Sequence, residues 1–164
     1  MRDQLILEEA YMFNIVLVEP EIPQNTGNIS RTCAITGSPL HLVHPLGFSI
    51  ADKHLKRAGL DYWKYLDLFN YESFSEFEHL HPNCRFLLCS THGLTQYQNI
   101  QYKTDDFLIF GKETAGLPKE LLDRYAKDTV RIPMCDGFRS LNLSNAVSII
   151  LYEALRQNRF LGMT

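Results

Sequence analysis

Three short segments of the chain carry polar side chains and glycines in arrangements that could bind a ligand and act on it. NTGNISR (25–31) places Asn25 and Arg31 on either side of a helix start, GKETAG (111–116) follows an apolar run, and RSLNLSNA (139–146) opens an apolar helix. Helix N-termini present unpaired N–H groups and favour negative charge, and glycines let backbone approach a ligand closely. These segments are therefore the first candidates for a functional site.

Each segment also has a purely structural interpretation. The turn 111–116 lacks the upstream glycine of the phosphate-binding pattern G-x-x-x-x-G-K-[ST], so it does not predict a nucleotide triphosphate site. Arg31 could be an ordinary surface arginine, and Asn142 or Ser144 could simply cap the last helix. Taken singly, the segments leave a ligand site and a set of turns and caps equally open.

The other reactive side chains do not indicate a nucleophile or a metal site. Cys89, Ser90 and His92 lie close in the sequence, but Cys89 ends an apolar run, and a thiolate nucleophile needs a partly exposed, electropositive setting. The four cysteines form no C-x-x-C pair, and the six histidines are scattered. We therefore predict no metal.

The charge balance gives a mixed indication about nucleic acid. The formal net charge of −3 argues mildly against an RNA partner. However, charge acts only within about 10 Å at ordinary salt, so a local patch would be enough. The sequence has one candidate for a basic patch, a cluster within five residues: Lys53, His54, Lys56 and Arg57. This cluster could also be a solvated helix face. The pairs Tyr62–Trp63 and Tyr97–Tyr102 could stack on bases, or pack in the core or at its rim.

These side chains must be positioned by alternating strands and helices. Short apolar runs predict strands over 13–20, 40–45, 84–91, 106–111 and 129–133. Helical patterns begin at Asn25 or Thr26 and end at Gly37, and then recur over 51–58, 73–80, 117–125 and from Asn142 to about Gln157. The class is α/β with a mainly parallel sheet flanked by helices. Ligands bind beyond the carboxyl ends of such strands, which selects the loops 90–93, 111–116 and the stretch after Ile132.

Length and composition predict one ordinary domain. With 164 residues, 45% of them hydrophobic, the chain can bury a core without disulfides or metal. We expect the domain to span 13–164, preceded by an extension over 1–12 that need not be ordered. No apolar run approaches the roughly 18 residues that a membrane span needs. Unpaired cysteines, three of them in apolar runs, favour a reducing, cytoplasmic setting.

In this order and spacing, the segments resemble one known family. NTGNISR, FGKETAGLP and IPM…RSLNLSNAVSIILYEA look like the three signature motifs of the SPOUT superfamily of RNA methyltransferases. NIVLVEPEIPQNTGNISR, together with GF…DKHLKRAGLDYW, narrows the resemblance to the single-domain branch that 2′-O-methylates the wobble nucleotide, cytidine or uridine, of tRNA. The resemblance covers residues 14–157.

The resemblance implies a fold and a methyl donor. The C-terminal part of the sheet would be tied in a deep trefoil knot, which pattern reasoning would not propose because knots are nearly absent from proteins. The donor S-adenosylmethionine would lie in the knot. The residues that would contact the donor are Cys89, Thr91, Gly111, Gly116, Ile132, Ser140 and Leu141. Cys89 stands where the family more commonly has an aliphatic residue.

The resemblance also implies roles at the acceptor. Arg31 would act on the 2′-hydroxyl, with Asn25, Glu113, Ser140 and Asn142 completing the site. A guanidinium stays protonated and has no acceptor, so we prefer a role in which Arg31 binds the adjacent phosphate and polarises the hydroxyl. The anticodon stem-loop would be positioned by phosphate contacts from Lys53, Lys56, Arg57 and Arg139.

The resemblance also implies a homodimer with the C-terminal helix in the interface. The apolar residues of this helix cover more than one narrow face, and a partner subunit would bury the remainder.

Two alternative functions stay open. One is 2′-O-methylation of ribosomal RNA or of another tRNA position. The other is a non-catalytic RNA-binding protein that kept the fold.

Overall fold

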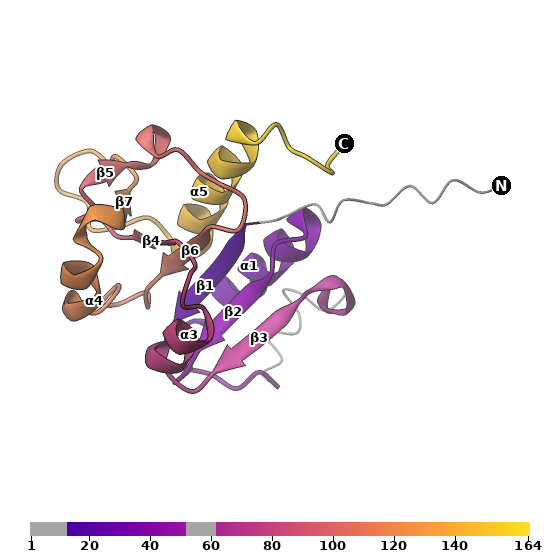
Figure 1. The fold of residues 1–164 in the computed structure, drawn as a ribbon. Helices are drawn as coiled ribbons and strands as arrows, with labels where there is room; N and C mark the ends of the chain where they lie inside the picture. The colour runs from indigo at the N-terminus through magenta and orange to yellow at the C-terminus, as the bar shows by residue number, and fades with distance from the viewer. Residues whose placement is uncertain (1–12, 52–61) are drawn as a thin grey trace.

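The apolar runs form one parallel sheet with an unusual strand order. The computed structural model describes residues 13–51 and 62–164. Its sheet has seven strands in the order β3-β2-β1-β6-β4-β7-β5, and every neighbouring pair is parallel (Figure 1). The strands are β1 (Asn14–Val18), β2 (Leu40–Val43), β3 (Leu68–Tyr71), β4 (Phe86–Cys89), β5 (Thr95–Gln96), β6 (Phe107–Phe110) and β7 (Thr129–Arg131). The predicted α/β class is confirmed.

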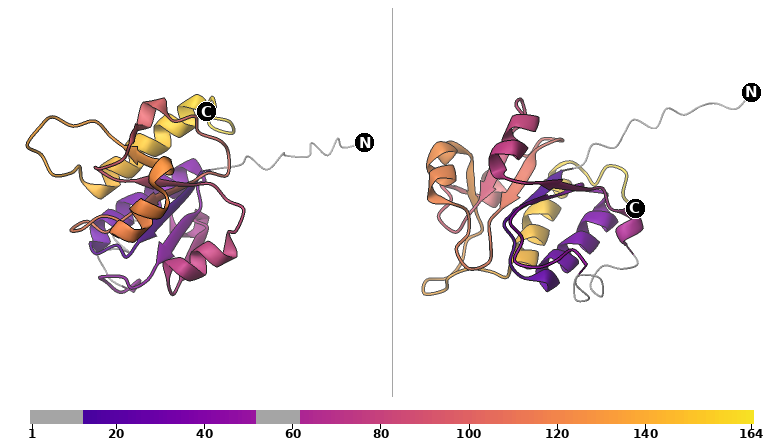
Figure 2. Two further views of the ribbon diagram at one scale, coloured as in Figure 1. Left: turned by 60° about the vertical axis from the view of Figure 1, so that its left-hand side comes forward. Right: turned by 90° about the horizontal axis from the view of Figure 1, so that it is seen from below.

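Helices cover both faces of this sheet. The longer helices α1 and α5 lie side by side on one face, and the shorter α3 and α4 lie on the other (Figures 1 and 2). Their bounds are α1 (Pro23–Thr36), α3 (Phe74–Leu80), α4 (Lys119–Arg124) and α5 (Leu143–Gln157), with 3-10 turns η1 (Trp63–Tyr65), η2 (Tyr97–Asn99) and η3 (Ala126–Asp128). The helix expected over 51–58 lies almost wholly outside the described residues.

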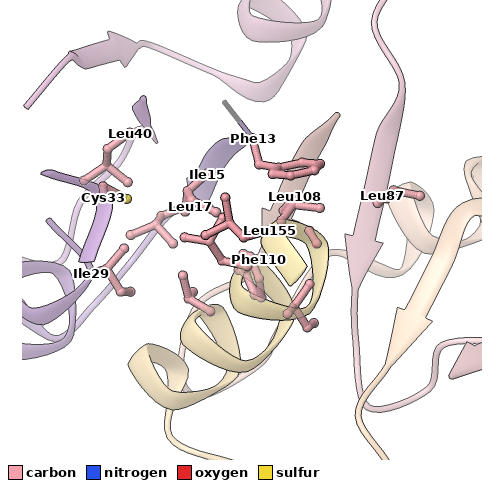
Figure 3. Close-up of a cluster of buried hydrophobic side chains, with 14 of the residues drawn as sticks. Phe13, Ile15, Leu17, Ile29, Cys33, Leu40, Leu87, Leu108, Phe110 and Leu155 are labelled. Carbon is pink, nitrogen blue, oxygen red and sulfur yellow. The ribbon is translucent and has the colours of Figure 1, made fainter. Parts of the chain in front are cut away.

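Alternate residues of the central strands point to opposite faces of the sheet and pack in two separate cores. Side chains on one face pack against α1 and α5, and Figure 3 shows them converging on α5: Phe13, Ile15, Leu17, Ile29, Cys33, Leu40, Leu87, Leu108, Phe110 and Leu155. The intervening residues face α3 and α4 in a core rich in aromatic rings: Val16, Val18, Val43, Tyr71, Phe77, Phe86, Leu88, Phe107, Ile109, Leu117 and Leu121. Burial on both faces explains why these strands read as continuous apolar runs rather than alternating ones.

Some helix boundaries agree with the predictions from the sequence and others differ. Gly37 ends α1 in the left-handed conformation (φ 63°), as expected. The start of α1 was wrong: the helix begins at Pro23, after Ile22, because proline suits the first helical turn. Pro118 precedes α4 as its N-cap and is not inside it. Asn142 caps α5 as predicted.

Other differences concern the edges of the sheet and the cysteines. Strands β3 and β5 were missed, because each is short and carries no apolar run of its own. Cys84 lies just before β4 and is exposed, whereas Cys33 is buried. The threading of the knot stays a prediction. Among the described residues, no helix is both long and apolar enough to cross a membrane.

A polar network is embedded in the aromatic core. The imidazole of His41 is buried; its Nδ1 lies 2.8 Å from the Tyr71 hydroxyl and its Nε2 lies 3.2 Å from Oδ1 of Asn14. The same hydroxyl lies 3.1 Å from Nε2 of His81. Burial lowers the pKa of His41 from 6.5 to about 3, with a smaller contribution from His81, whose own pKa is also lowered by burial. The core therefore holds His41 neutral.

This network predicts acid sensitivity of the fold. Between pH 6.5 and about 3 the unfolded chain binds a proton at His41 that the folded chain does not, so stability falls as the pH is lowered through this range. We expect a slope of up to about 1.4 kcal/mol per pH unit from this group, measured by urea unfolding at several pH values. His41→Gln should lower stability at pH 7 and flatten the slope. The exposed His79→Gln is the control, and an unchanged slope in His41→Gln would contradict the interpretation.

Candidate functional site

The carboxyl ends of β4, β6 and β7 open into one large pocket. Since all strands are parallel, the loops that follow these strands meet at the same edge of the sheet, as predicted. The pocket has a volume of about 1440 Å³. Its walls are the loop 90–92, the turn 111–116 and the segment from Ile132 to the start of α5, which Figure 2 shows as a long orange loop standing out from the sheet.

The pocket gathers most of the residues that were singled out in the sequence. Its lining includes all seven residues expected to contact the donor: Cys89, Thr91, Gly111, Gly116, Ile132, Ser140 and Leu141. It also includes the polar residues Asn25, Glu113, Arg139 and Asn142. Asn25 and Asn142, 117 positions apart in the sequence, thus line the same cavity.

The turn 111–116 folds tightly back on itself. Backbone N–H of Gly116 donates to the carbonyl of Lys112 over 2.8 Å, and Gly116 has a left-handed φ of 68°. A Cβ on Gly111 would lie 2.1 Å from the carbonyl carbon of Gly116, so only glycine fits there. A Cβ on Gly116 would instead meet open space. Gly111 is therefore needed for the turn itself, and Gly116 for its backbone conformation.

Glu113 holds the segment that leads into helix α1. The residue before α1, Ile22, has no side chain that can accept a hydrogen bond. The Glu113 carboxylate accepts from the backbone N–H of Glu21 (2.8 Å), from that of Ile22 (3.1 Å) and from Nδ2 of Asn25 (3.0 Å). A carboxylate at this end of a helix is also favoured by the helix dipole. The turn 111–116 is thereby fixed to the start of α1.

The same two segments are also joined in the opposite direction. The Glu21 carboxylate accepts from the backbone N–H (3.1 Å) and the hydroxyl (2.7 Å) of Thr114, and these bonds lower the pKa of Glu21. The ammonium of Lys112 lies 2.7 Å from the carboxylate of Glu19, which raises the pKa of Lys112. Glu19, Glu21 and Lys112 were missed in the sequence, although two acidic residues directly after a strand and before a helix were a visible signal.

A second link connects α1 to α5. Nδ2 of Asn142 donates to Oδ1 of Asn25 over 2.9 Å. Oδ1 of Asn142 accepts from the backbone N–H of Ser144 (2.9 Å) and caps α5. Glu113, Asn25 and Asn142 therefore form one hydrogen-bonded chain through all three sequence motifs. In this structure their polar groups bind one another, so they hold the pocket in shape; a role in catalysis stays a prediction.

Cys89 has the properties of an apolar residue in the pocket wall and not those of a nucleophile. Its thiol lies at the end of β4, with Sγ 3.8 Å from the carbonyl oxygen of Leu87. Burial raises the pKa of the thiol far above its usual range. A neutral thiol is a small apolar surface, which agrees with the sequence interpretation.

Arg31 does not line the pocket. It lies on α1, six residues beyond Asn25, and is exposed. Six residues correspond to about 9 Å along a helix and to a different face. Its guanidinium lies against Tyr62, with Nη2 3.2 Å from the tyrosine hydroxyl. Arg31 is thus the one candidate catalytic residue that the structure does not bring into the pocket wall.

The predicted RNA-binding residues are only partly visible. Arg139 is exposed and lines the pocket beside Ser140. Lys53, Lys56 and Arg57 lie outside the described residues. Among the residues that are described, no group of three His, Cys, Asp or Glu side chains could hold a metal ion.

The hydrogen bonds that Glu113 accepts predict a stability effect. Glu113→Gln replaces one acceptor oxygen with an NH2 group, which would face an N–H of Glu21 or Ile22. We expect the free energy of unfolding to fall by about 1–3 kcal/mol, measured by chemical denaturation, with faster amide exchange at Glu21 and Ile22. The matched control is Glu120→Gln, on the exposed first turn of α4. Equal effects of the two substitutions would contradict the assignment.

Comparison with known proteins gives one consistent result. A family model described as the SpoU rRNA Methylase family matches residues 12–152. The tRNA (cytidine(34)-2'-O)-methyltransferase of Yersinia pestis is 48% identical over 157 residues, which cover 92% of this chain and 97% of that protein.

Solved structures agree with the sequence match. One, described as "Structural insights into the 2-OH methylation of C/U34 on tRNA", has a TM-score of 0.87 and 45% identity, and the match covers 91% of this chain and 97% of that one. The AdoMet-bound rRNA methyltransferase from Sinorhizobium meliloti has a TM-score of 0.80 and 28% identity, over 88% of this chain and 56% of that one. The chain belongs to the SpoU rRNA Methylase family.

Proposed function

We propose that this protein transfers the methyl group of S-adenosylmethionine to the ribose 2′-hydroxyl of the wobble nucleotide, cytidine or uridine, in tRNA anticodon loops. The observation that carries the proposal is the pocket at the carboxyl edge of the sheet, where residues of the three motifs meet and are joined by hydrogen bonds among Glu113, Asn25 and Asn142. The relatives named for this reaction match nearly their whole length. The ribosomal RNA enzyme is matched over little more than half, which favours tRNA.

The residues of the pocket fit the donor. A volume of about 1440 Å³ exceeds the 300–1,000 Å³ of usual small-molecule sites, so the pocket has room for S-adenosylmethionine and for a nucleotide beside it. Cys89, Ile132 and Leu141 supply apolar walls suited to a purine. The turn 111–116 and the start of α5 supply backbone groups for the polar end of the donor. When bound, S-adenosylmethionine provides a methyl group already activated by its sulfonium.

The work left to the chain is positioning and proton transfer. Holding two reactants in line can contribute roughly 7–11 kcal/mol, and the links from Glu113 to Asn142 make the walls that do this rigid. Arg31 acts from beside the pocket, where it binds the phosphate next to the acceptor ribose and polarises the 2′-hydroxyl. Because a guanidinium has no acceptor, the proton leaves to water or to a carbonyl.

The active form is a homodimer through α5. This helix buries Val147, Ile150, Leu151 and Ala154 in its own core, yet Ile149 and Tyr152 remain about 36% and 41% exposed on another side. We assign this side of α5 to the interface, where a second copy of the helix would cover both side chains. A cytoplasmic setting agrees with the four free cysteines, of which Cys84 and Cys135 are exposed.

The reaction predicts a single labelled position. Incubation of total tRNA with methyl-labelled S-adenosylmethionine should label the ribose of nucleotide 34, mapped by nuclease digestion and mass spectrometry. An anticodon stem-loop with a 2′-deoxy nucleotide at that position is the matched control and should take up no label. Label elsewhere in tRNA or only in ribosomal RNA would contradict the proposed substrate. Failure to bind the donor in calorimetry would contradict catalysis.

The proposed dimer interface on α5 predicts that a substitution there lowers the molecular mass of the particle in solution. Tyr152→Asp should place a charge in the apolar surface and convert the dimer to a monomer, measured by sedimentation, with loss of tRNA methylation. Leu80→Asp is the control, since Leu80 is 58% exposed at the end of α3, on the opposite face of the sheet. A wild-type monomer, or an unchanged dimer in Tyr152→Asp, would show that α5 does not form the interface.

A further inference from the structure

We infer that Tyr62 is a positioning residue for Arg31, a role that rests on the proposed function. The guanidinium carbon of Arg31 lies 4.8 Å from the centroid of the Tyr62 ring, within the range of a cation–π contact. In addition, Nη2 of Arg31 lies 3.2 Å from the Tyr62 hydroxyl and donates to it. Tyr62 therefore holds the guanidinium by both its ring and its polar end.

Tyr62 can fix Arg31 only if it is itself fixed. Its backbone carbonyl accepts from the N–H of Tyr65 over 2.9 Å, which closes the 3-10 turn η1. The residue after this turn, Leu66, packs against the core beneath α1 and α5. The turn η1 also contacts α1, the helix that carries Arg31. The ring of Tyr62 thus belongs to a segment anchored on the same core as the arginine.

The chemistry of the pair suits an arginine that must bind an anion. An exposed arginine side chain has many rotamers, and a partner that restricts them preorganises the guanidinium. A carboxylate partner would do so, but it would also neutralise the charge and compete with a phosphate. A tyrosine ring and hydroxyl orient the cation without neutralising it. The hydrogen bond engages one of the five N–H donors of a guanidinium, which leaves the planar fork able to meet phosphate and ribose oxygens.

Under the proposed function, Arg31 acts on the acceptor and not on the donor. Neither Arg31 nor Tyr62 lines the pocket. Loss of the contact should therefore change the turnover of bound substrates and leave the affinity for S-adenosylmethionine unchanged. Tyr62 acts through Arg31, so its contribution should vanish once Arg31 is removed.

The test is a double-mutant cycle on tRNA methylation. We expect Tyr62→Leu to lower kcat about 10- to 100-fold, since a misplacement of about 1 Å can cost 10²-fold, with an unchanged KM for S-adenosylmethionine. Tyr62→Phe keeps the ring and should lose only a few-fold in kcat. Arg31→Ala with Tyr62→Leu should be no slower than Arg31→Ala alone. Losses that multiply in the double variant, or a Tyr62→Leu enzyme as fast as the wild type, would overturn the inference.

The chain offers a matched control in the same turn. Lys64 lies 4.8 Å from the centroid of the Tyr65 ring, a cation–π contact of the same length that involves neither Arg31 nor a residue of the pocket lining. Tyr65→Leu should leave kcat unchanged; an equal loss in Tyr65→Leu and Tyr62→Leu would mean that damage to η1 is responsible, and would overturn the inference.

A second readout does not depend on activity. The Nε–H resonance of Arg31, identified by its absence in Arg31→Lys, should move in Tyr62→Leu as the ring-current shift is lost. An unmoved resonance overturns the Tyr62 contact even if methylation occurs as proposed. A moved resonance in a protein that methylates no RNA confirms the contact but overturns the proposed function, and with it the positioning role.

Discussion

The carboxylate of Glu113 is the contact on which the architecture of the site depends. It accepts from two backbone N–H groups ahead of α1 and from the side chain of Asn25, which in turn binds the cap of α5. One side chain from the turn after β6 thereby connects the N-terminal regions of the two helices that cover one face of the sheet. Glu21 and Lys112 strengthen the connection from the opposite side. Together these bonds join the turn 111–116 to the starts of α1 and α5.

This arrangement changes the interpretation of the polar residues in the motifs. Asn25, Glu113 and Asn142 have side chains that could act on a substrate, and the sequence pattern assigns them to a site. In the folded chain their hydrogen-bonding groups are used within the protein, because each satisfies a helix end or a partner that would otherwise lack one. They form the frame of the pocket. Arg31, which is held by Tyr62 and carries a charge facing solvent, is the group with capacity left for an acceptor.

The two faces of the sheet serve different purposes. The face under α1 and α5 supports the pocket, since both helices start at it and α5 is capped there by Asn142. The opposite face is closed by aromatic rings around the neutral imidazole of His41. A stable, water-excluding core on that side allows the carboxyl edge of the sheet to carry glycine turns and charged groups that contribute little packing of their own.

The individual residues of the pocket were predicted from the family resemblance. The residues alone predicted the α/β class, the central strands and the capped start of α5. These features follow from local properties: apolar runs, a capping asparagine, and glycine where a turn needs it. The start of α1 was misplaced because Pro23 was not recognised as the first helical residue, and β3 and β5 were missed because each is short and carries no apolar run of its own. The contact of Glu113 with the backbone of Ile22, 91 positions away, and the contact of Arg31 with Tyr62 become visible only in the folded chain. Hydrogen bonds between distant segments leave no periodicity in the sequence, so their partners emerge only when the sheet brings them together.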